Sequence, residues 1–291
     1  MENFSPQGEN YYAFAKINLS LEILRKRPDG FHELVSVMQT IGLYDTIRIA
    51  PAEDLEFDCN IPELVEETNL VWRAALALLD LCDPELKRGA KIYLEKNIPV
   101  AAGLGGGSSD AAATLLALNN IWSLNLPTWR LQEIAATLGS DIPFFIEGGT
   151  ALVEGRGEIL TPLPAFPTAW VTLLYPDLEM PANKTAELYR ALGRNDFGTG
   201  GVTRALVNAI QRGERPAQSL FHNTFEQIVY ERFPQMDHFR QEMVDAGADH
   251  VRVSGSGPTL FNLTYDRDEA ETLAERLKAQ GLQAFAVQTV Q

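Results

Sequence analysis

The chain has 291 residues, of which 45% are hydrophobic, and its 39 acidic and 24 basic side chains give a formal net charge of −15 at pH 7. This length favours two domains over one, and the hydrophobic fraction is ample for two cores. The negative charge argues against DNA or RNA as partners, because it would repel a phosphate backbone.

The sequence has no run of about 18 apolar residues, so we expect no membrane-spanning helix. Residues Met1–Pro6 lack the basic and apolar regions of a signal peptide. Cys59 and Cys82 are too few for a disulfide framework or a zinc site, and we expect both to be reduced. These features predict a cytoplasmic protein that contacts neither a membrane nor nucleic acid.

Residues 11–24 alternate between apolar and polar side chains, which predicts a half-buried strand. Lys16 and Asn18 are neighbours on its polar face. That face is either a solvated sheet surface, which periodicity alone favours, or the polar floor of an active site. The turn Pro28-Asp29-Gly30 then puts Phe31 and His32 at the start of the next segment, where each taken alone is more typical of a structural residue.

Further strands are predicted over Thr46–Ala50, Leu55–Cys59 and Ala90–Ile98. Between the last two, apolar residues at helical spacing predict a helix over Leu70–Leu79, and Thr68-Asn69 is its expected cap.

A glycine-rich stretch follows the last of these strands and runs Pro99-Val-Ala-Ala-Gly-Leu-Gly-Gly-Gly-Ser-Ser-Asp110. We expect Ser108–Asp110 to cap a helix over Ala111–Trp122, so that glycine backbone N–H groups and a helix N-terminus form a cradle for phosphate groups. The stretch lacks the Gly-Lys-Ser/Thr of a Walker A loop, and Ser108 replaces the third glycine of a dinucleotide-binding loop. The alternative is a strand-to-helix turn that binds nothing.

A helix is predicted over Thr128–Leu138, with Gly139 as its C-terminal signal. Asp141 follows and is either the N-cap of a short turn or a functional carboxylate. A hairpin over Thr150–Pro162 turns at Gly155-Arg156-Gly157.

The proline-rich residues 162–167 predict a boundary between domains 1–163 and 164–291. The second domain opens with a strand over Ala169–Tyr175 and continues with several helices between Thr185 and Gly247. It closes as strand, glycine-rich turn, strand, helix and strand. The whole chain is predicted to be α+β.

Four separated stretches resemble the GHMP kinases. They are Ala15-Lys-Ile-Asn-Leu19 with Arg27-Pro-Asp-Gly-Phe-His-Glu-Leu34, Pro99–Ala112, Ser140-Asp-Ile-Pro-Phe-Phe145, and Ser254-Gly-Ser-Gly-Pro258. The resemblance covers nearly the whole chain. It implies a fold of two α+β lobes with the active site in the cleft between them, and ATP as phosphoryl donor.

The resemblance also implies the roles of particular residues. Lys16 and Asp141 match the catalytic lysine and aspartate, the aspartate accepting the hydroxyl proton and the lysine keeping it ionised and offsetting γ-phosphoryl charge. ATP would bind along the loop, at Pro99, Val100, Ala101, Ala102, Gly103, Leu104, Gly105, Gly106, Gly107, Ser108 and Ser109. Mg²⁺ is expected with ATP, and Ser108 or Ser109 is the nearest hydroxyl in the loop.

The Arg27–Leu34 stretch implies a particular acceptor, the 2-hydroxyl of a cytidine diphosphate sugar alcohol in isoprenoid precursor biosynthesis. Asn18, Phe31, His32, Thr185 and Tyr189 match its binding residues, with the cytosine ring between Phe31 and Tyr189 and hydrogen-bonded by His32. Position 31 is usually tyrosine in such kinases, and phenylalanine keeps the ring but loses the hydroxyl.

Two alternatives stay open. Another GHMP kinase, of the homoserine or mevalonate type, would have no reason for a histidine flanked by aromatic residues. A catalytically silent nucleotide sensor on the same fold should lack the Lys16 and Asp141 pair.

Overall fold

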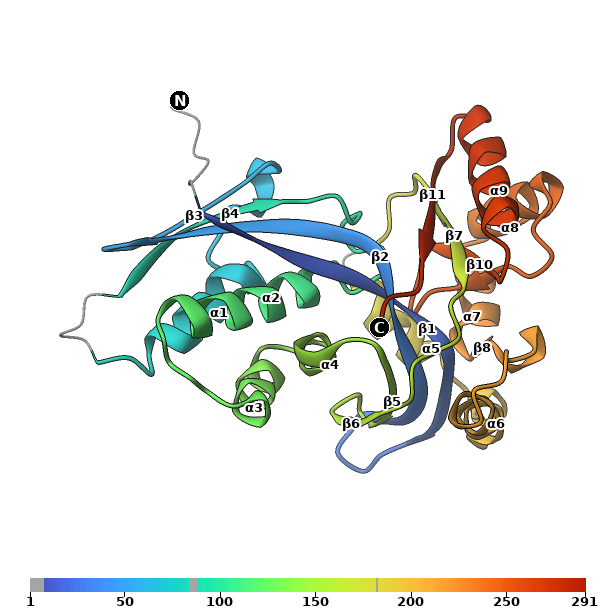
Figure 1. Cartoon of the computed structure of the whole chain (residues 1–291). Coiled ribbons are helices and arrows are strands. Elements are labelled where there is room, and N and C mark those ends of the chain that lie inside the picture. Colours follow the sequence, from blue (N-terminus) through green and yellow to red (C-terminus); the bar gives the residue numbers. More distant parts are fainter. Residues whose placement is uncertain (1–7, 84–87, 182) are drawn as a thin grey trace. The chain divides into compact units, whose positions relative to one another are not determined.

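The computed structural model of the chain describes residues 8–83, 88–181 and 183–291. They form two compact units that interleave along the sequence (Figure 1). The first unit contains the residues up to Ala15, Leu43–Val100 and Gly105–Glu147, and the second contains Lys16–Gly42, Ala101–Leu104 and Gly148–Gln291. The domain boundary after residue 163 stays a prediction, because these units are spatial groups that the chain enters more than once.

The first unit contains strands in the order β3-β4-β2-β1. β4 (Gly89–Glu95) pairs antiparallel with the second half of β2 (His32–Ala52), and β3 (Leu55–Cys59) runs parallel to β4. The first residues of β1 (Glu9–Lys26) complete this part. The three strands predicted here are confirmed, although the first is only the end of the long β2 and the last ends at Glu95, before the predicted Ile98.

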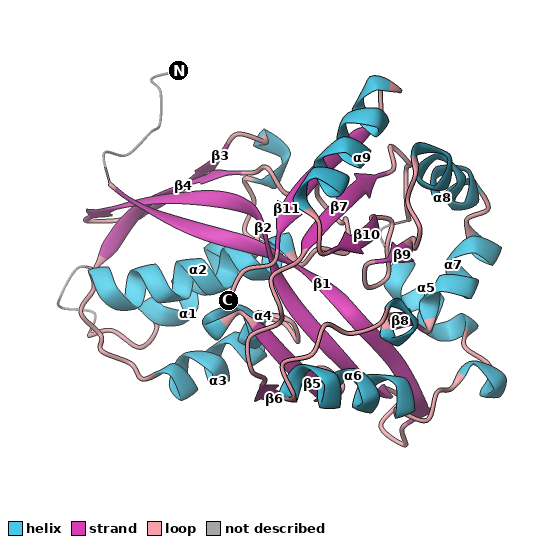
Figure 2. Ribbon diagram, turned by 45° about the vertical axis from the view of Figure 1, so that its right-hand side comes forward, coloured by secondary structure: helices cyan, strands magenta, loops and turns pink. Residues whose placement is uncertain are grey.

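The helices of the first unit cover one face of these strands, and α1 and α2 lie side by side there (Figures 1 and 2). Buried alanines of α2, at positions 111, 112, 113 and 117, let the two helices approach closely. α1 begins where the Asn69 side chain accepts the Val71 N–H at 2.9 Å, so the predicted cap is confirmed. The helical segments of this unit are α1 (Leu70–Leu79), α2 (Gly106–Ile121), α3 (Thr128–Leu138), α4 (Ile142–Glu147) and the short η1 (Pro62–Leu64).

The second unit contains the first half of β2, against which β5 (Thr150–Gly155) pairs antiparallel. β6 (Ile159–Pro162) returns beside β5, with Glu154 opposite Ile159, so the predicted hairpin is confirmed. The short β8 (His222–Asn223) runs parallel to β1.

A separate sheet in the second unit has the order β11-β7-β10-β9. Both β10 (Leu260–Thr264) and β11 (Gln283–Gln288) are antiparallel to β7 (Trp170–Tyr175), and α9 (Arg267–Ala279) connects them. The predicted order of the last elements is therefore confirmed. The remaining elements are α5 (Lys184–Ala191), η3 (Arg194–Asp196), α6 (Gly201–Gln211), η4 (Gln218–Leu220), α7 (Phe225–Arg232), α8 (Gln235–Ala246) and β9 (Arg252–Val253).

The polar face of β1 is not solvated, so the prediction of a half-buried strand is wrong. Lys16, Asn18, Ser20 and Glu22 are each at most 4% exposed. Other segments of the second unit cover them, and the side chains of Lys16, Asn18 and Glu22 form hydrogen bonds there. The Glu22 carboxylate, for example, accepts hydrogen bonds from backbone N–H groups at the start of α6, from Gly200 at 3.0 Å and from Thr203 at 2.8 Å.

None of the helices in the described ranges has the length and apolar character needed to cross a membrane.

Candidate active site

The glycine-rich loop connects the end of β4 to the start of α2. Gly103 and Gly105 adopt left-handed φ angles of 81° and 72°, which few other residues tolerate. Gly106 already belongs to α2, so the predicted cap at Ser108–Asp110 is wrong and the helix starts four residues before Asp110. The reason is that the Asp110 carboxylate pairs with the buried Lys96 ammonium, at 2.8 Å, instead of with backbone N–H groups of a helix end.

The carbonyl oxygens of the loop segment in the second unit are held by neighbouring groups. Ala102 O accepts from Thr259 N at 3.2 Å, Gly103 O from Ser254 Oγ at 3.1 Å, and Leu104 O from Lys16 N at 2.9 Å. A Cβ atom at Gly103 would lie 2.9 Å from Gly257 O, so only glycine allows this close approach. The loop segment is therefore fixed to the turn at Ser254–Thr259.

The backbone N–H groups of the loop are oriented differently from its carbonyls. From Ala101 to Ser108, none of them donates a hydrogen bond to another described residue. Successive N–H donors that end at the positive end of a helix are the donors a phosphate-binding loop requires. These N–H groups are therefore available to an anion, and ATP binding at them stays a prediction.

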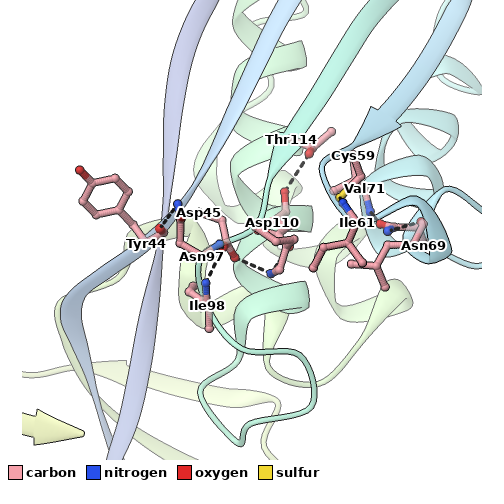
Figure 3. Close-up of polar contacts among 12 residues, drawn as sticks. Tyr44, Asp45, Cys59, Ile61, Asn69, Val71, Asn97, Ile98, Asp110 and Thr114 are labelled. Atoms are coloured by element: carbon pink, nitrogen blue, oxygen red, sulfur yellow. Dashed lines mark hydrogen bonds and ion pairs between the residues drawn. The ribbon is translucent and has the colours of Figure 1, made fainter. Parts of the chain in front are cut away.

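A buried ion cluster lies at the base of the loop within the first unit. Lys96 Nζ donates to Asp45 Oδ2 and to Asp110 Oδ2, and all three side chains are at most 4% exposed. Asp45 Oδ1 in turn accepts the N–H groups of Asn97 at 2.6 Å and Ile98 at 2.8 Å, as Figure 3 shows. The cluster therefore ties the chain before the loop to the first turns of α2.

Burial shifts the pKa values in this cluster. It raises the pKa of Asp110 well above its usual range, and the negative charge of Asp45 adds to this effect. Burial alone would lower the pKa of Lys96, but its two carboxylate partners outweigh burial and raise it. Lys96 is thus held charged, and removal of a partner would leave a buried charge without compensation.

Two adjacent glycines of α2 differ in the space around them. A Cβ at Gly106 would lie 3.0 Å from both Ile98 Cγ2 and Lys96 Nζ, whereas one at Gly107 would meet only Leu70 Cδ1 at 3.7 Å. A side chain at Gly106 would therefore crowd Ile98 and the ion cluster. Gly107 is exposed and is not required by packing.

Lys16 and Asn18 form one hydrogen-bonded group on β1 in the second unit. Lys16 Nζ donates to Asn18 Oδ1 at 2.7 Å and to Gly103 O at 3.2 Å, while Asn18 Nδ2 donates to Ser36 Oγ at 2.8 Å. The Asn18 amide is thereby fixed in orientation. Lys16 is thus in direct contact with the glycine-rich loop.

Asp141 lies in the first unit, in the turn between α3 and α4. It directly precedes α4, whose first residue is Ile142. Its backbone position is compatible with an N-cap role, and its side chain is partly exposed. Gly139 ends α3 as predicted, but with an extended φ of 178° in place of the left-handed conformation of a typical terminal glycine.

The predicted substrate residues of the second unit gather around an aromatic group. The His32 ring stacks on Tyr189, with 5.0 Å between ring centroids, and Tyr189 meets Phe225 edge to face at 5.0 Å. Phe31 is 55% exposed, and the Arg156 guanidinium lies over its ring, 4.8 Å from the ring centroid. His32 thus stacks directly on Tyr189, and the placement of cytosine between Phe31 and Tyr189 stays a prediction.

Two polar groups complete this part of the site. Burial, with a contribution from the positive charge of Lys26, lowers the pKa of His32 below its usual 6.5. The imidazole is therefore neutral at pH 7 and offers one donor and one acceptor. Thr185 Oγ1 lies 2.9 Å from Ser256 Oγ, which joins α5 to the Gly255–Pro258 turn.

No group of three His, Cys, Asp or Glu side chains that could hold a metal ion occurs within the described ranges.

Comparisons with known proteins identify the class. Residues 69–149 match the family described as GHMP kinases N terminal domain, and residues 204–283 match GHMP kinases C terminal. The structure of a homoserine kinase from Cytophaga hutchinsonii superposes with a TM-score of 0.71 at 16% identity, over 100% of this chain and 97% of that one. The chain is therefore a GHMP kinase, and the predicted fold class is confirmed.

Relatives of higher identity define the family more narrowly. A 4-diphosphocytidyl-2-C-methyl-D-erythritol kinase from Dehalococcoides mccartyi is 42% identical over 276 residues, which are 95% of this chain and 96% of the relative. A crystal structure of 4-(cytidine 5'-diphospho)-2C-methyl-D-erythritol kinase is 36% identical with a TM-score of 0.82, and covers 97% of this chain and 100% of that one. The chain belongs to the 4-diphosphocytidyl-2-C-methyl-D-erythritol kinase family.

Sequence reasoning missed the ion cluster of Asp45, Lys96 and Asp110. Asp45 directly precedes the predicted strand Thr46–Ala50, and Lys96 lies near the end of the predicted strand Ala90–Ile98, where charged residues are ordinary. Asp110 follows two serines, which favoured the capping interpretation. Lys96 and Asp110 lie on either side of the glycine-rich loop in the sequence, and this placement is a signal that could have indicated their ion pair.

Proposed function

We propose that this chain transfers the γ-phosphoryl group of ATP to the 2-hydroxyl group of 4-diphosphocytidyl-2-C-methyl-D-erythritol, a step of the non-mevalonate route to isoprenoid precursors. The observation that carries the phosphoryl-transfer part is the run of backbone N–H groups from Ala101 to Ser108, none of which has an acceptor within the described residues. The acceptor substrate rests on the family to which the chain belongs.

ATP would lie along Pro99–Ser109, with its phosphates hydrogen-bonded by the loop N–H groups. Phosphoryl transfer passes through a loose transition state, so catalysis depends on positioning and on stabilisation of charge more than on a strong base. The substrate oxygen attacks the γ-phosphorus, the bond from that phosphorus to the β–γ bridging oxygen breaks, and ADP leaves. The hydroxyl proton passes to the Asp141 carboxylate late in the transfer.

Lys16 would offset the negative charge on the γ-phosphoryl group and keep Asp141 ionised. Its buried ammonium is oriented by Asn18 Oδ1 and Gly103 O, so that little reorganisation is needed during the reaction. Asn18, which belongs to the same hydrogen-bonded group as Lys16, would contact the substrate.

The cytidine part would be bound by Phe31, His32, Thr185 and Tyr189. Neutral His32 can pair with the donor and acceptor edge of cytosine, and the aromatic rings can stack on the base at about 1–3 kcal/mol per face. Since His32 stacks on Tyr189 in this structure, we propose that the two rings separate to admit the base, or that cytosine stacks on the exposed Phe31 ring.

Mg²⁺ is proposed to arrive with ATP. Mg²⁺ keeps several waters and typically takes one or two protein ligands in addition to phosphate oxygens. The described residues contain no cage of acidic or histidine side chains, which fits an ion carried mainly by the nucleotide, and Ser108 or Ser109 is the candidate protein ligand. When bound, the ion would neutralise charge on the β- and γ-phosphates. We also propose a cytoplasmic location and no nucleic-acid partner, in keeping with the net charge of −15.

The test is to incubate the protein with ATP and Mg²⁺ and each of several alcohols, and to measure ADP. The alcohols are the cytidine diphosphate substrate, 2-C-methylerythritol, homoserine and mevalonate. ADP formation with the cytidine diphosphate substrate alone is expected. Equal turnover of 2-C-methylerythritol, or preference for homoserine or mevalonate, would refute the substrate assignment, and no turnover of any alcohol would favour the nucleotide sensor.

A further inference from the structure

Lys184 is a buried lysine at the start of α5 in the second unit. Only 5% of the residue is exposed, although it is a long cationic side chain that prefers water. Its Nζ donates to the carbonyl oxygen of Ala101 at 3.3 Å and to that of Gly257. Within the described ranges, no carboxylate forms an ion pair with it.

Lys184 Nζ has two carbonyl acceptors, which equals the number of N–H donors on a neutral amine. An ammonium group has three N–H donors, whereas the neutral amine has two and a lone pair. Burial lowers the pKa of Lys184 to about 8, which brings the neutral form within reach near physiological pH. A buried lysine without a carboxylate is unfavourable for folding, so its contribution lies in the two carbonyl groups that it holds.

Lys184 completes a set of contacts to the loop. The next three carbonyls along the loop, those of Ala102, Gly103 and Leu104, are held by Thr259, Ser254 and Lys16. Lys184 holds the first one, Ala101 O. Its second acceptor, Gly257 O, belongs to the same turn that holds the middle of the segment.

Peptide planarity converts these contacts into an orientation of donors. In a trans peptide the C=O of one residue and the N–H of the next point in opposite directions across one rigid plane. A carbonyl held by the protein therefore aims the following N–H away from it. By this geometry Lys184, through Ala101 O, sets the direction of the Ala102 N–H, and the other three contacts do the same for the N–H groups of residues 103–105.

We propose that Lys184 is a positioning residue of the phosphate-binding loop: by holding Ala101 O against the Gly255–Pro258 turn, it aims the Ala102 N–H toward the phosphates of ATP. The inference rests on the proposed function in that ATP is taken as the ligand of the loop. Lys184 does not contact the nucleotide itself, and it acts through the peptide plane between residues 101 and 102.

The test compares Lys184→Met with the wild type and with Arg190→Met, which removes an exposed cation from the same helix. The dissociation constant of ATP with Mg²⁺ is measured by calorimetric titration, and KM for both substrates and kcat are measured by ADP release. Lys184→Met is expected to weaken ATP binding on the order of ten-fold, as for the loss of a buried hydrogen bond. Arg190→Met should stay within about two-fold of wild type, and so should KM of Lys184→Met for the cytidine diphosphate substrate.

ATP affinity of Lys184→Met within about two-fold of wild type would overturn the proposal. An equal loss of affinity for both substrates would also overturn it, because general destabilisation does not select ATP. If Lys184→Met does not fold, Lys184→Gln keeps an N–H donor on a shorter side chain and is expected to lose about five-fold, with a loss below about two-fold again overturning the proposal. The titration needs no acceptor alcohol, so a wild type that binds ATP but ignores the cytidine diphosphate substrate refutes the proposed substrate and leaves this inference intact.

Discussion

Replacement of Lys184 by methionine should change how protein stability depends on pH. Methionine has nearly the length of lysine without its ionisable group, so the variant keeps most of the packing and loses the titration. The pKa of Lys184 is lowered from 10.5 to about 8 because burial penalises its charged form. In the unfolded chain the side chain is solvated and titrates near its ordinary value.

The sign follows from proton binding. Between about pH 8 and pH 10.5 the unfolded chain binds more protons at this site than the folded protein does, so stability rises with pH across that window. Each pKa unit corresponds to about 1.4 kcal/mol, so the full penalty below pH 8 is about 3 kcal/mol, and about 2 kcal/mol of it should be relieved on going from about pH 7 to about pH 9.5.

Urea unfolding of wild type and Lys184→Met near pH 7 and near pH 9.5 measures this effect. Other groups titrate over the same range, but they do so in both proteins and cancel in the difference between them. Wild type should gain about 2 kcal/mol relative to the variant at the higher pH. A difference between the two proteins that is the same at both pH values would show that Lys184 titrates as an ordinary solvated lysine, and the argument from its burial would fail.

The other predictions concern the loop and the two substrate sites. Asp141→Asn should fold and bind ATP normally but lower kcat by on the order of 10² or more, and wild-type turnover would leave Asp141 only a capping role. Gly106→Ala should lower the urea midpoint, because its Cβ would meet buried atoms at 3.0 Å. Gly107→Ala should keep the midpoint and weaken ATP binding. Equal midpoints for the two variants would contradict this prediction. Tyr189→Ala should raise KM for the cytidine diphosphate substrate, while His32→Ala should mainly reduce the preference for cytidine over uridine. Unchanged ATP affinity is the control for both, and wild-type KM and cytidine preference would remove the aromatic and histidine assignments.

Local patterns were sufficient where one periodicity or one turn residue decides the structure. The Asn69 cap, the hairpin at Gly155–Gly157 and the strand, helix and strand order after His250 were all predicted from short stretches. In each case the interactions that decide the element lie within a few residues of it, so the sequence window contains them.

Patterns failed where a distant side chain changes the environment. The alternation in β1 is real, but its polar face is buried, and distant groups such as Ser36 and the start of α6 bind its Asn18 and Glu22 side chains. Asp110 has the sequence context of a cap, yet Lys96 captures its carboxylate and the helix extends toward the loop. Lys184 gave no signal at all, since neither of its carbonyl acceptors can be read from side-chain types.

The glycine-rich loop and the Ser254–Pro258 turn are separated by about 150 residues in the sequence, yet they are joined by hydrogen bonds in the structure. Gly103 must be glycine because the Gly257 carbonyl lies 2.9 Å from where its Cβ would be, and that approach lets Ser254 Oγ reach Gly103 O. The turn therefore holds carbonyls that would otherwise compete for the loop N–H groups, and the N–H groups stay available for an anion. A substitution in the turn should then weaken phosphate binding by releasing these carbonyls, which gives a physical reason why both motifs occur together in this chain.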